Sequence, residues 1–280
     1  MEEITVLMPV YNGEASVGDA VRSVLEQSYG DFRLLVVDDG STDGTAEVVK
    51  SFADGRIDYV RRPHDYVASL NYGLDHARGK YVARMDADDL MHPDRLRVQH
   101  AVMEQEERID ICGTWYTRFG EGVGENRRLV AAHSGWVETP ALAFLERNLL
   151  CHPSVMVRRS FLEAHALRYE SAYCYAEDYR LWAEAARRGA GFYVEPQSLL
   201  YYRLSAGQIC QTQRPQQREA SHRLRDELAE WVLTHMEGAA PFRALWESLN
   251  ALVGAERIDF ETKMQLFCAV LRKNNELFNF

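Results

Sequence analysis

Short runs of apolar, mostly β-branched residues alternate with segments of helical apolar spacing over the first ninety residues. The runs have the length of buried strands, and the segments between them, such as residues 16–27, predict helices. Short connections between alternating strands and helices imply right-handed crossovers and a mainly parallel central sheet flanked by helices, an α/β fold. The four expected strands are Ile4–Val10, Phe32–Val37, Ile57–Val60 and Lys80–Met85.

Polar side chains follow three of these four expected strands. Tyr11-Asn12 follows the first, Asp38-Asp39 the second, and Asp86 to Asp89 the fourth. Ligands of open parallel sheets bind beyond the carboxyl ends of the strands, where these residues would meet. We therefore expect the active site at this edge.

The acidic run after the fourth strand has the pattern of a metal site. In Asp86-Ala87-Asp88, two side chains at a strand end can turn towards one point. Mg²⁺ and Mn²⁺ take oxygen ligands and complete their shells with water and substrate phosphates. The alternative is an acidic turn whose aspartates cap a helix, but the place at a strand end favours the metal site.

The first two strand ends offer groups for a nucleotide. A carboxylate in the run Asp38 to Asp43 can accept hydrogen bonds from a uracil N–H or a ribose hydroxyl, although part of this run must also cap a helix. Tyr11, which follows Pro9 by two residues, could stack against a base or simply pack.

A second acidic pair, Glu177-Asp178, opens a predicted helix. A helix N-terminus stabilises an ionised carboxylate, which near an acceptor hydroxyl can act as a general base. Simple pairing of the charge with the helix dipole is the alternative. Arg203, at the end of a late strand, suits a diphosphate, and Arg84 is either a site contact or half of a buried structural ion pair.

Charge and cysteine usage exclude other classes. The net charge is −10, from 42 acidic and 32 basic residues, which argues against nucleic acid as a partner. The five cysteines form no C-x-x-C pair, so reduced thiols in the cytosol are expected. The N-terminus does not resemble a signal peptide, and no apolar run is long enough to span a membrane.

Six segments in order, within about residues 4–210, resemble the inverting glycosyltransferases of family 2, which have the GT-A fold. This resemblance implies a UDP-sugar donor, a divalent metal and direct in-line attack on the anomeric carbon. The segments are Val10–Gly13, Ser23–Ser28, Val37–Asp43, Leu70–Leu74, Met85–Asp89 and Ala176–Trp182.

The resemblance also implies roles for single residues. Pro9, Tyr11 and Asp39 would hold the uridine. Asp86 would contact the ribose or nucleotide, and Asp88 would bind Mn²⁺ or Mg²⁺ on the diphosphate.

On the acceptor side, the resemblance makes Asp178 the base that deprotonates the acceptor hydroxyl. Within the family, residues 175–179, residues 202–204 and Gln208 look closest to bacterial lipooligosaccharide enzymes that add galactose, N-acetylglucosamine or N-acetylgalactosamine in β-1,3 linkage. The expected acceptor is then a glycan or glycolipid.

Two positions depart from the family pattern. Asp65 stands where relatives often have a glycine, and Ser205 where they often have a histidine that helps to hold the metal or diphosphate. Closure over the diphosphate would then rely on Arg203 or on a different group, and we expect a lower affinity for the metal.

Beyond the resemblance, residues 216–280 predict a helical appendage to a catalytic domain of residues 1–215. Its last helix offers a mild amphipathic face for a peripheral contact with the inner face of the cytoplasmic membrane; packing within the protein is the alternative. The face comprises Met264, Phe267, Leu271, Arg272 and Lys273.

Three other functions share some of these features. A nucleotide-sugar binding module would keep Asp39 and Asp88 without needing Asp178. A nucleotidyltransferase would share the metal carboxylates, but no glycine- and lysine-rich loop follows the first strand. A glycosidase would also use paired carboxylates, but it has no need of the nucleotide-type strand ends.

Overall fold

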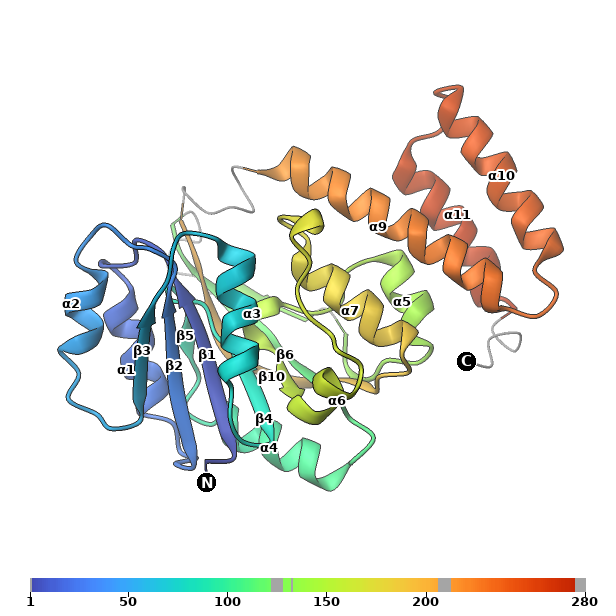
Figure 1. Ribbon diagram of the computed structural model, residues 1–280. Coiled ribbons are helices and arrows are strands. Elements are labelled where there is room, and N and C mark those ends of the chain that lie inside the picture. Colours follow the sequence, from blue (N-terminus) through green and yellow to red (C-terminus); the bar gives the residue numbers. More distant parts are fainter. Residues whose placement is uncertain (1, 122–127, 132, 206–212, 275–280) are drawn as a thin grey trace.

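The computed structural model describes residues 2–121, 128–131, 133–205 and 213–274, and its central feature is one mixed sheet. The strands lie in the order β3-β2-β1-β4-β9-β6-β10-β5, with β7 beside β6 and β8 beside β10 (Figure 1). The strands are β1 Ile4–Val10, β2 Phe32–Asp38, β3 Ile57–Arg61, β4 Tyr81–Arg84, β5 Leu90–Met91, β6 Ile111–Gly120, β7 Arg128–Val130, β8 Gly135–Trp136, β9 Met156–Arg158 and β10 Phe192–Leu204.

Helices cover both faces of the sheet. The short 3₁₀ turns η1 and η2 lie in the connections after α5 and α6. The helices are α1 Val17–Leu25, α2 Thr45–Lys50, α3 Tyr66–His76, α4 Arg95–Gln105, α5 Pro140–Glu146, α6 Arg159–Ala164, α7 Glu177–Arg187, α9 Arg214–His235, α10 Ala240–Gly254 and α11 Phe260–Arg272, and the turns are η1 His152–Ser154 and η2 Ser171–Tyr173.

The predicted mainly parallel sheet is confirmed. β1 pairs in parallel with β2 and β4, β2 with β3, and β6 with β10, whereas the short β5, β7, β8 and β9 run antiparallel to their neighbours. Every residue of β1 is buried, because α1 covers one face of the strand and α3 the other. Leu7 packs on the α3 side, and its neighbours Val6 and Met8 pack on the α1 side.

The expected loop or hairpin from Arg118 to Glu125 falls between two paired strands: β6 pairs antiparallel with β7, in register from Tyr116 with Val130 to Arg118 with Arg128. The long strand β6, which begins at Ile111, was not expected, and one expected strand needs correction. Residues 122–127 lie outside the described residues. The strand expected over residues 151–157 is only the short β9, Met156–Arg158. Pro153 lies in η1 and has no N–H to donate to a neighbouring strand.

The cysteines are free thiols throughout the described residues, as expected from their spacing. Cys210 lies outside these residues. The free cysteines are Cys112, Cys151, Cys174 and Cys268.

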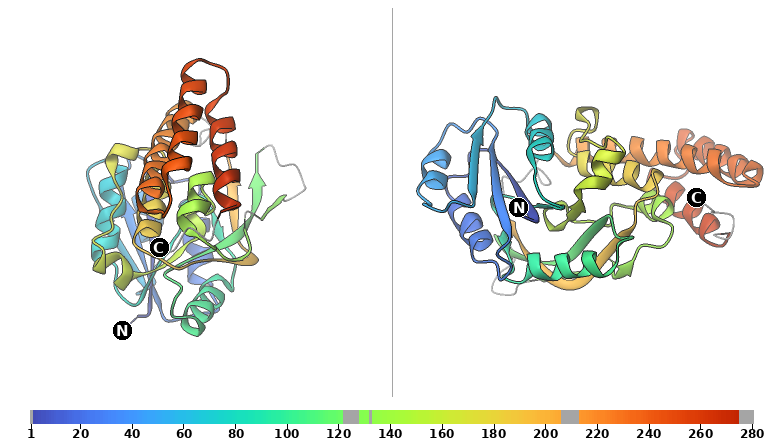
Figure 2. Two further views of the ribbon diagram at one scale, coloured as in Figure 1. Left: turned by 90° about the vertical axis from the view of Figure 1, so that its right-hand side faces the viewer. Right: turned by 60° about the horizontal axis from the view of Figure 1, so that its bottom comes forward.

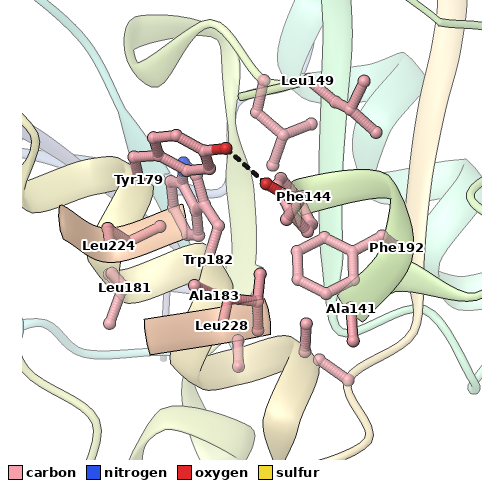
Figure 3. Close-up of a cluster of buried hydrophobic side chains, with 14 of the residues drawn as sticks. Ala141, Phe144, Leu149, Tyr179, Leu181, Trp182, Ala183, Phe192, Leu224 and Leu228 are labelled. Carbon is pink, nitrogen blue, oxygen red and sulfur yellow. Dashed lines mark hydrogen bonds between the residues drawn. The ribbon is translucent and has the colours of Figure 1, made fainter. Parts of the chain in front are cut away.

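The predicted C-terminal helices form, and they share a core with the helices on the sheet. α9 packs on α5 and α7, and α11 packs on α5 and α10, so the three extend the molecule on the side away from α1 and α2 (Figures 1 and 2). Figure 3 shows Leu224 and Leu228 of α9 beside Trp182, and the Tyr179 hydroxyl donating to the Phe144 carbonyl. A domain boundary after residue 215 stays a prediction.

The apolar residues of the face proposed for membrane contact do not lie on the surface. Met264, Phe267 and Leu271 are fully buried in the core shared with α5, α9 and α10, and Arg272 pairs with Glu146 of α5. That assignment of the face was therefore wrong, and the alternative, packing within the protein, is what the structure has. None of the described helices is both long and apolar enough to cross a bilayer.

Phe267→Ala should lower the free energy of unfolding by about 3 to 5 kcal/mol, because it leaves a cavity in this shared core. Urea unfolding followed by circular dichroism measures the change. Leu266→Ala is the matched control, since Leu266 is 48% exposed on the same helix and should change stability by less than about 1 kcal/mol. Equal effects of the two substitutions would contradict the described position of α11.

Candidate active site

The loops after β1 and β2 are fixed to each other by hydrogen bonds. The Asn12 N–H donates to Ser41 Oγ at 2.9 Å, and the Thr42 N–H donates to Asn12 Oδ1 at 2.8 Å. Asn12 has a φ of 49°, the left-handed conformation that Asn tolerates better than most residues. The expected Tyr11-Asn12 and Asp38-Asp39 segments therefore do meet at one edge of the sheet.

The neighbouring aspartates after β2 have different environments. Asp38 is bonded within the fold, since its carboxylate accepts from the Ser41 N–H at 2.7 Å and from the Tyr59 hydroxyl. In Asp39, which is 1% exposed, Oδ1 accepts from the Asp65 N–H at 2.8 Å and from Ser69 Oγ at 2.6 Å.

The second carboxylate oxygen of Asp39, Oδ2, is buried without a hydrogen-bond partner. His64 Nδ1 lies 2.9 Å from Asp39 Oδ2, but not in hydrogen-bond geometry. Asp39 therefore presents one rigidly held acceptor, suited to an N–H group of a ligand.

An aromatic pair lies beside Asp39. Tyr11 is 48% exposed, and its ring stacks on that of His64 with 4.2 Å between centroids. Pro9 is buried in β1, in register with Val37 of β2 and one residue before the end of the strand. Of the three residues expected to hold uridine, Tyr11 and Asp39 are brought together at the edge.

The structure accounts for Asp65 at the position where relatives often have glycine. Asp65 is the N-cap of α3, its side chain accepts from the Ala68 N–H at 3.0 Å, and its backbone is extended at φ −163°. Any residue adopts this backbone, so glycine is not needed here. The N–H of Asp65 instead helps to hold Asp39.

The acidic run after β4 forms a three-carboxylate cluster. Asp86, Asp88 and Asp89 each offer an oxygen, and these oxygens lie within 4.8 Å of one another. Asp89 is buried, Oδ1 accepts from the Arg203 N–H at 2.8 Å, and Oδ2 has no partner. Burial, together with Asp86 and Asp88, raises the pKa of Asp89 well above its usual value. A divalent cation with oxygen ligands fits this cluster.

Arg203, on β10, contacts the acidic loop that follows β4. Its Nε donates to the Asp88 carbonyl at 2.6 Å, and its guanidinium lies over the Phe119 ring, 4.6 Å from the centroid. Ser205 follows β10 and ends the described part of this segment, and Gln208 lies outside the described residues.

The second acidic pair lies in the first turn of α7. Asp178 Oδ2 accepts from Asn148 Nδ2 at 3.0 Å, and burial raises the pKa of Asp178 although the Tyr179 N–H opposes this. Glu177 is also buried, its Oε2 has no partner, and burial followed by the charge of Asp178 raises its pKa to about 7.

Arg84 forms the buried ion pair that the sequence left as an alternative. It is 3% exposed, pairs with Asp86, and donates from Nη2 to the Tyr66 hydroxyl at 2.7 Å. His152, from η1, bonds through Nε2 to the Tyr169 hydroxyl at 2.8 Å, and burial lowers the pKa of His152 well below its usual value. His152 is therefore neutral and bonds Tyr169 within the fold.

Buried carboxylate oxygens without a hydrogen-bond partner mark this edge of the sheet. Among the described residues they are Asp39 Oδ2, Asp89 Oδ2 and Glu177 Oε2, and each belongs to a segment named above. Buried polar atoms in folded proteins normally find partners, so three such acceptors together indicate bound donors or a cation.

Two residues of the site were not assigned a role from the sequence. Asp89 directly follows Asp86-Ala87-Asp88, and Asn148, which bonds the expected base, lies in a loop without a motif. Asp89 could have been found from its place directly after the D-x-D pattern, whereas Asn148 meets Asp178 only through the fold.

A hollow of about 540 Å³ lies elsewhere, between α7, α9 and α10. Its carboxylates are already paired: Glu227 with Arg180, Glu230 with Arg243, and Asp226 with Lys263. It holds none of the unpartnered carboxylate oxygens and does not compete as the active site.

The sequence of residues 5–165 matches the family described as Glycosyl transferase family 2. An uncharacterized glycosyltransferase of Haemophilus influenzae is 28% identical over 238 residues, which cover 80% of this chain and 72% of that protein. The succinoglycan biosynthesis protein ExoO of Rhizobium meliloti is 30% identical over 223 residues, which cover 74% of this chain and 62% of ExoO. The putative glycosyltransferase EpsE of Bacillus subtilis is 35% identical over 164 residues, 56% of this chain and 57% of EpsE.

Solved structures share the fold at low sequence identity. Residues 1–349 of S. aureus TarS in complex with UDP-GlcNAc superpose with a TM-score of 0.67 at 19% identity, over 90% of this chain and 73% of that one. The mannosyltransferase PcManGT from Pyrobaculum calidifontis, in complex with GDP-Man and Mn²⁺, gives a TM-score of 0.56 at 17% identity, over 96% of this chain and 86% of that one.

Glu177→Gln should stabilise the protein at alkaline pH. The pKa of Glu177 is raised in the folded state, so the folded protein keeps the Glu177 proton up to a higher pH than the unfolded chain does. The parent protein therefore loses stability as pH rises from about 4.5 to about 7. Relative to the parent protein, the variant should gain roughly 1 to 3 kcal/mol at about pH 8 and much less at about pH 5.

Urea unfolding at the two pH values measures this difference. Glu247→Gln, at an exposed position of α10, is the control and should show no gain that depends on pH. A Glu177→Gln gain that is the same at both pH values would refute the buried, protonatable carboxyl.

Proposed function

Since the chain belongs to glycosyl transferase family 2, we propose that it is an inverting, metal-dependent enzyme that transfers a hexose or N-acetylhexosamine from a UDP-sugar to a hydroxyl of a glycan acceptor. The observation that carries the proposal is the group of buried carboxylate oxygens without partners at the end of the parallel strands. Asp39, Asp89 and Glu177 supply these oxygens from β2, β4 and α7 segments that lie far apart in the sequence.

The uridine would bind at Tyr11 and Asp39. Asp39 Oδ2, which has no hydrogen-bond partner, can accept the imino N–H of uracil, and the exposed ring of Tyr11 offers a stacking surface. TarS, which shares the fold, has been solved in complex with UDP and with UDP-GlcNAc, and this supports the choice of a UDP-sugar.

The diphosphate would lie at the Asp86–Asp88–Asp89 cluster beside Arg203. Asp88 would bind Mn²⁺ or Mg²⁺, with Asp86 and Asp89 beside it, and the cation would neutralise the charge that develops on the diphosphate leaving group. Arg203 holds the loop through the Asp88 carbonyl, so the residues around the diphosphate remain fixed although the family histidine is replaced by Ser205.

Asp178 would take the proton from the acceptor hydroxyl. The acceptor oxygen then forms a bond to the anomeric carbon. On the opposite side, the bond between the anomeric carbon and the diphosphate oxygen breaks, so the configuration at that carbon inverts. Asn148 holds Asp178 Oδ2 at 3.0 Å, and the helix N-terminus favours the ionised form that a base needs.

The acceptor and linkage are narrower proposals. A β-1,3 linkage to a lipopolysaccharide or other oligosaccharide acceptor, made in the cytoplasm or at the inner face of its membrane, follows from the resemblance described above. The similarity to a succinoglycan biosynthesis protein supports a polysaccharide acceptor in general. A nucleotide-sugar binding module without turnover and a nucleotidyltransferase are the competing functions.

The variants Asp178→Asn and Asp88→Ala separate these functions. With a UDP-sugar, Mn²⁺ and an oligosaccharide acceptor, Asp178→Asn should lose about 10²- to 10⁴-fold in kcat while binding the donor normally, because only proton removal is affected. Asp88→Ala should instead lose the part of donor binding that requires the metal, measured by calorimetry with Mn²⁺ and with a chelator.

Asp19→Asn, at an exposed position of α1, is the control for both variants. Near-normal turnover of Asp178→Asn would refute Asp178 as the base. Donor binding without any turnover in the parent protein would favour the binding module.

A further inference from the structure

The two carboxylate oxygens of Asp39 differ in what they can still bind. Oδ1 accepts from the Asp65 N–H at 2.8 Å and from Ser69 Oγ at 2.6 Å, and these two donors use both of its lone pairs. Oδ2 has no hydrogen-bond partner among the described residues. Asp39 therefore has a single acceptor atom left for a ligand.

The start of α3 and the end of β1 hold this carboxylate in one orientation. Both donors to Oδ1 belong to the first turn of α3, where Asp65 is the N-cap and Ser69 is fully buried. On the backbone, the Asp39 N–H donates to the Val10 carbonyl at 2.8 Å. A rotation that turned Oδ1 towards a ligand would break the bonds from Asp65 and Ser69, so the orientation is fixed.

The imidazole of His64 lies against Asp39 Oδ2. Its ring stacks on Tyr11 with 4.2 Å between centroids and 28° between planes, and its Nδ1 lies 2.9 Å from Oδ2. Nδ1 is hydrogen-bonded to the Asp39 carbonyl instead, at 3.0 Å, and the His64 side chain is 60% exposed, so it can turn aside. Another flat ring with an N–H group can then take its place on Tyr11 and beside Oδ2.

We propose that Ser69 is a positioning residue that sets the base specificity of the donor site. Together with the Asp65 N–H, its hydroxyl occupies Asp39 Oδ1 and leaves Oδ2 as the single acceptor for uracil. The inference rests on the proposed function, in which the donor is a UDP-sugar. Because Ser69 is fully buried, it acts on the nucleotide only through Asp39.

The nucleotide bases differ in what they offer to a single acceptor. Uracil has one imino N–H between two carbonyl oxygens, so one acceptor is sufficient. Cytosine has an unprotonated ring nitrogen at the same position, and its lone pair would face the lone pairs of Asp39 Oδ2. Guanine has two neighbouring N–H donors, and the second would lose its hydrogen bond to water without finding an acceptor, because Oδ1 is already occupied. The fixed carboxylate therefore selects uracil.

Asp39→Asn should reverse the preference between uracil and cytosine. The two donors at Oδ1 require the amide oxygen on that side, so the amide nitrogen takes the place of Oδ2 and donates where the carboxylate accepted. With the full chain and Mn²⁺, calorimetry should show that the parent protein binds UDP at least about 10-fold more tightly than CDP. Asp39→Asn should bind CDP more tightly than UDP. The two nucleotides share the ribose and the diphosphate, so the ratio of their affinities isolates the base.

Ser69→Ala tests the serine directly, and it also provides the test if Asp39→Asn does not fold. Without the hydroxyl, Oδ1 regains a lone pair and the carboxylate is held less firmly, so the affinity for GDP relative to UDP should rise by about 5-fold or more. Ser154→Ala is the matched control. Ser154 is equally buried, but its hydroxyl donates to the Cys151 carbonyl at 2.8 Å, so its loss should leave the base preference unchanged.

These binding ratios separate the inference from the proposed function. Ratios that stay at the parent values in both Asp39→Asn and Ser69→Ala would overturn the role of Ser69 and leave the transferase standing. Equal affinity of the parent protein for UDP, CDP and GDP would also overturn the inference alone, since a transferase can use another donor. Shifted ratios in a protein that turns over no UDP-sugar would instead sink the proposed function and support the positioning role of Ser69.

Discussion

Negative charge gathered at one edge of a parallel sheet is the constraint on which the rest of the structure depends. β1, β2 and β4 run in the same direction, so the residues that follow them meet at one edge. Each of these three strands is followed by carboxylates or by an aromatic side chain. Desolvation makes such a cluster costly unless each carboxylate has a partner. Hydrogen bonds from the Asp65 N–H, the Arg203 N–H and Asn148 hold one oxygen of Asp39, Asp89 and Asp178, and Arg84 supplies a buried positive charge. Asp39 Oδ2 and Asp89 Oδ2 keep no hydrogen-bond partner within the described residues.

Much of this edge could be predicted because its signals are local. Buried β-branched runs such as Ile4–Val10 reveal the strands, and the polar residues directly after them reveal the binding edge, as at Asp39 and Asp86. β6 was missed because Gly113 and the polar residues after it break the apolar run, and the strand is fixed by its long pairing with β10. Asn148 could not be foreseen, since it meets Asp178 only when α5 and α7 pack together.

In the C-terminal helices, by contrast, the sequence pattern alone cannot distinguish between two structures. An amphipathic stripe on the last helix fits a membrane surface and a protein core equally well, because both bury the same apolar side chains. The structure places Met264, Phe267 and Leu271 inside the core that also contains Trp182 of α7. Glu177 and Asp178 lie in the first turn of α7, so the C-terminal helices support the helix that carries the proposed base.

The most direct test of the account is a crystal structure with UDP and Mn²⁺, in which anomalous scattering locates the metal. We expect a manganese peak at Asp86, Asp88 and Asp89, with the uracil against Asp39 and Tyr11 and with Asp178 facing the sugar side of the diphosphate. A manganese peak at the other cluster of candidate ligands among the described residues, Glu3, His100 and Glu104, or a nucleotide bound away from Asp39, would contradict it.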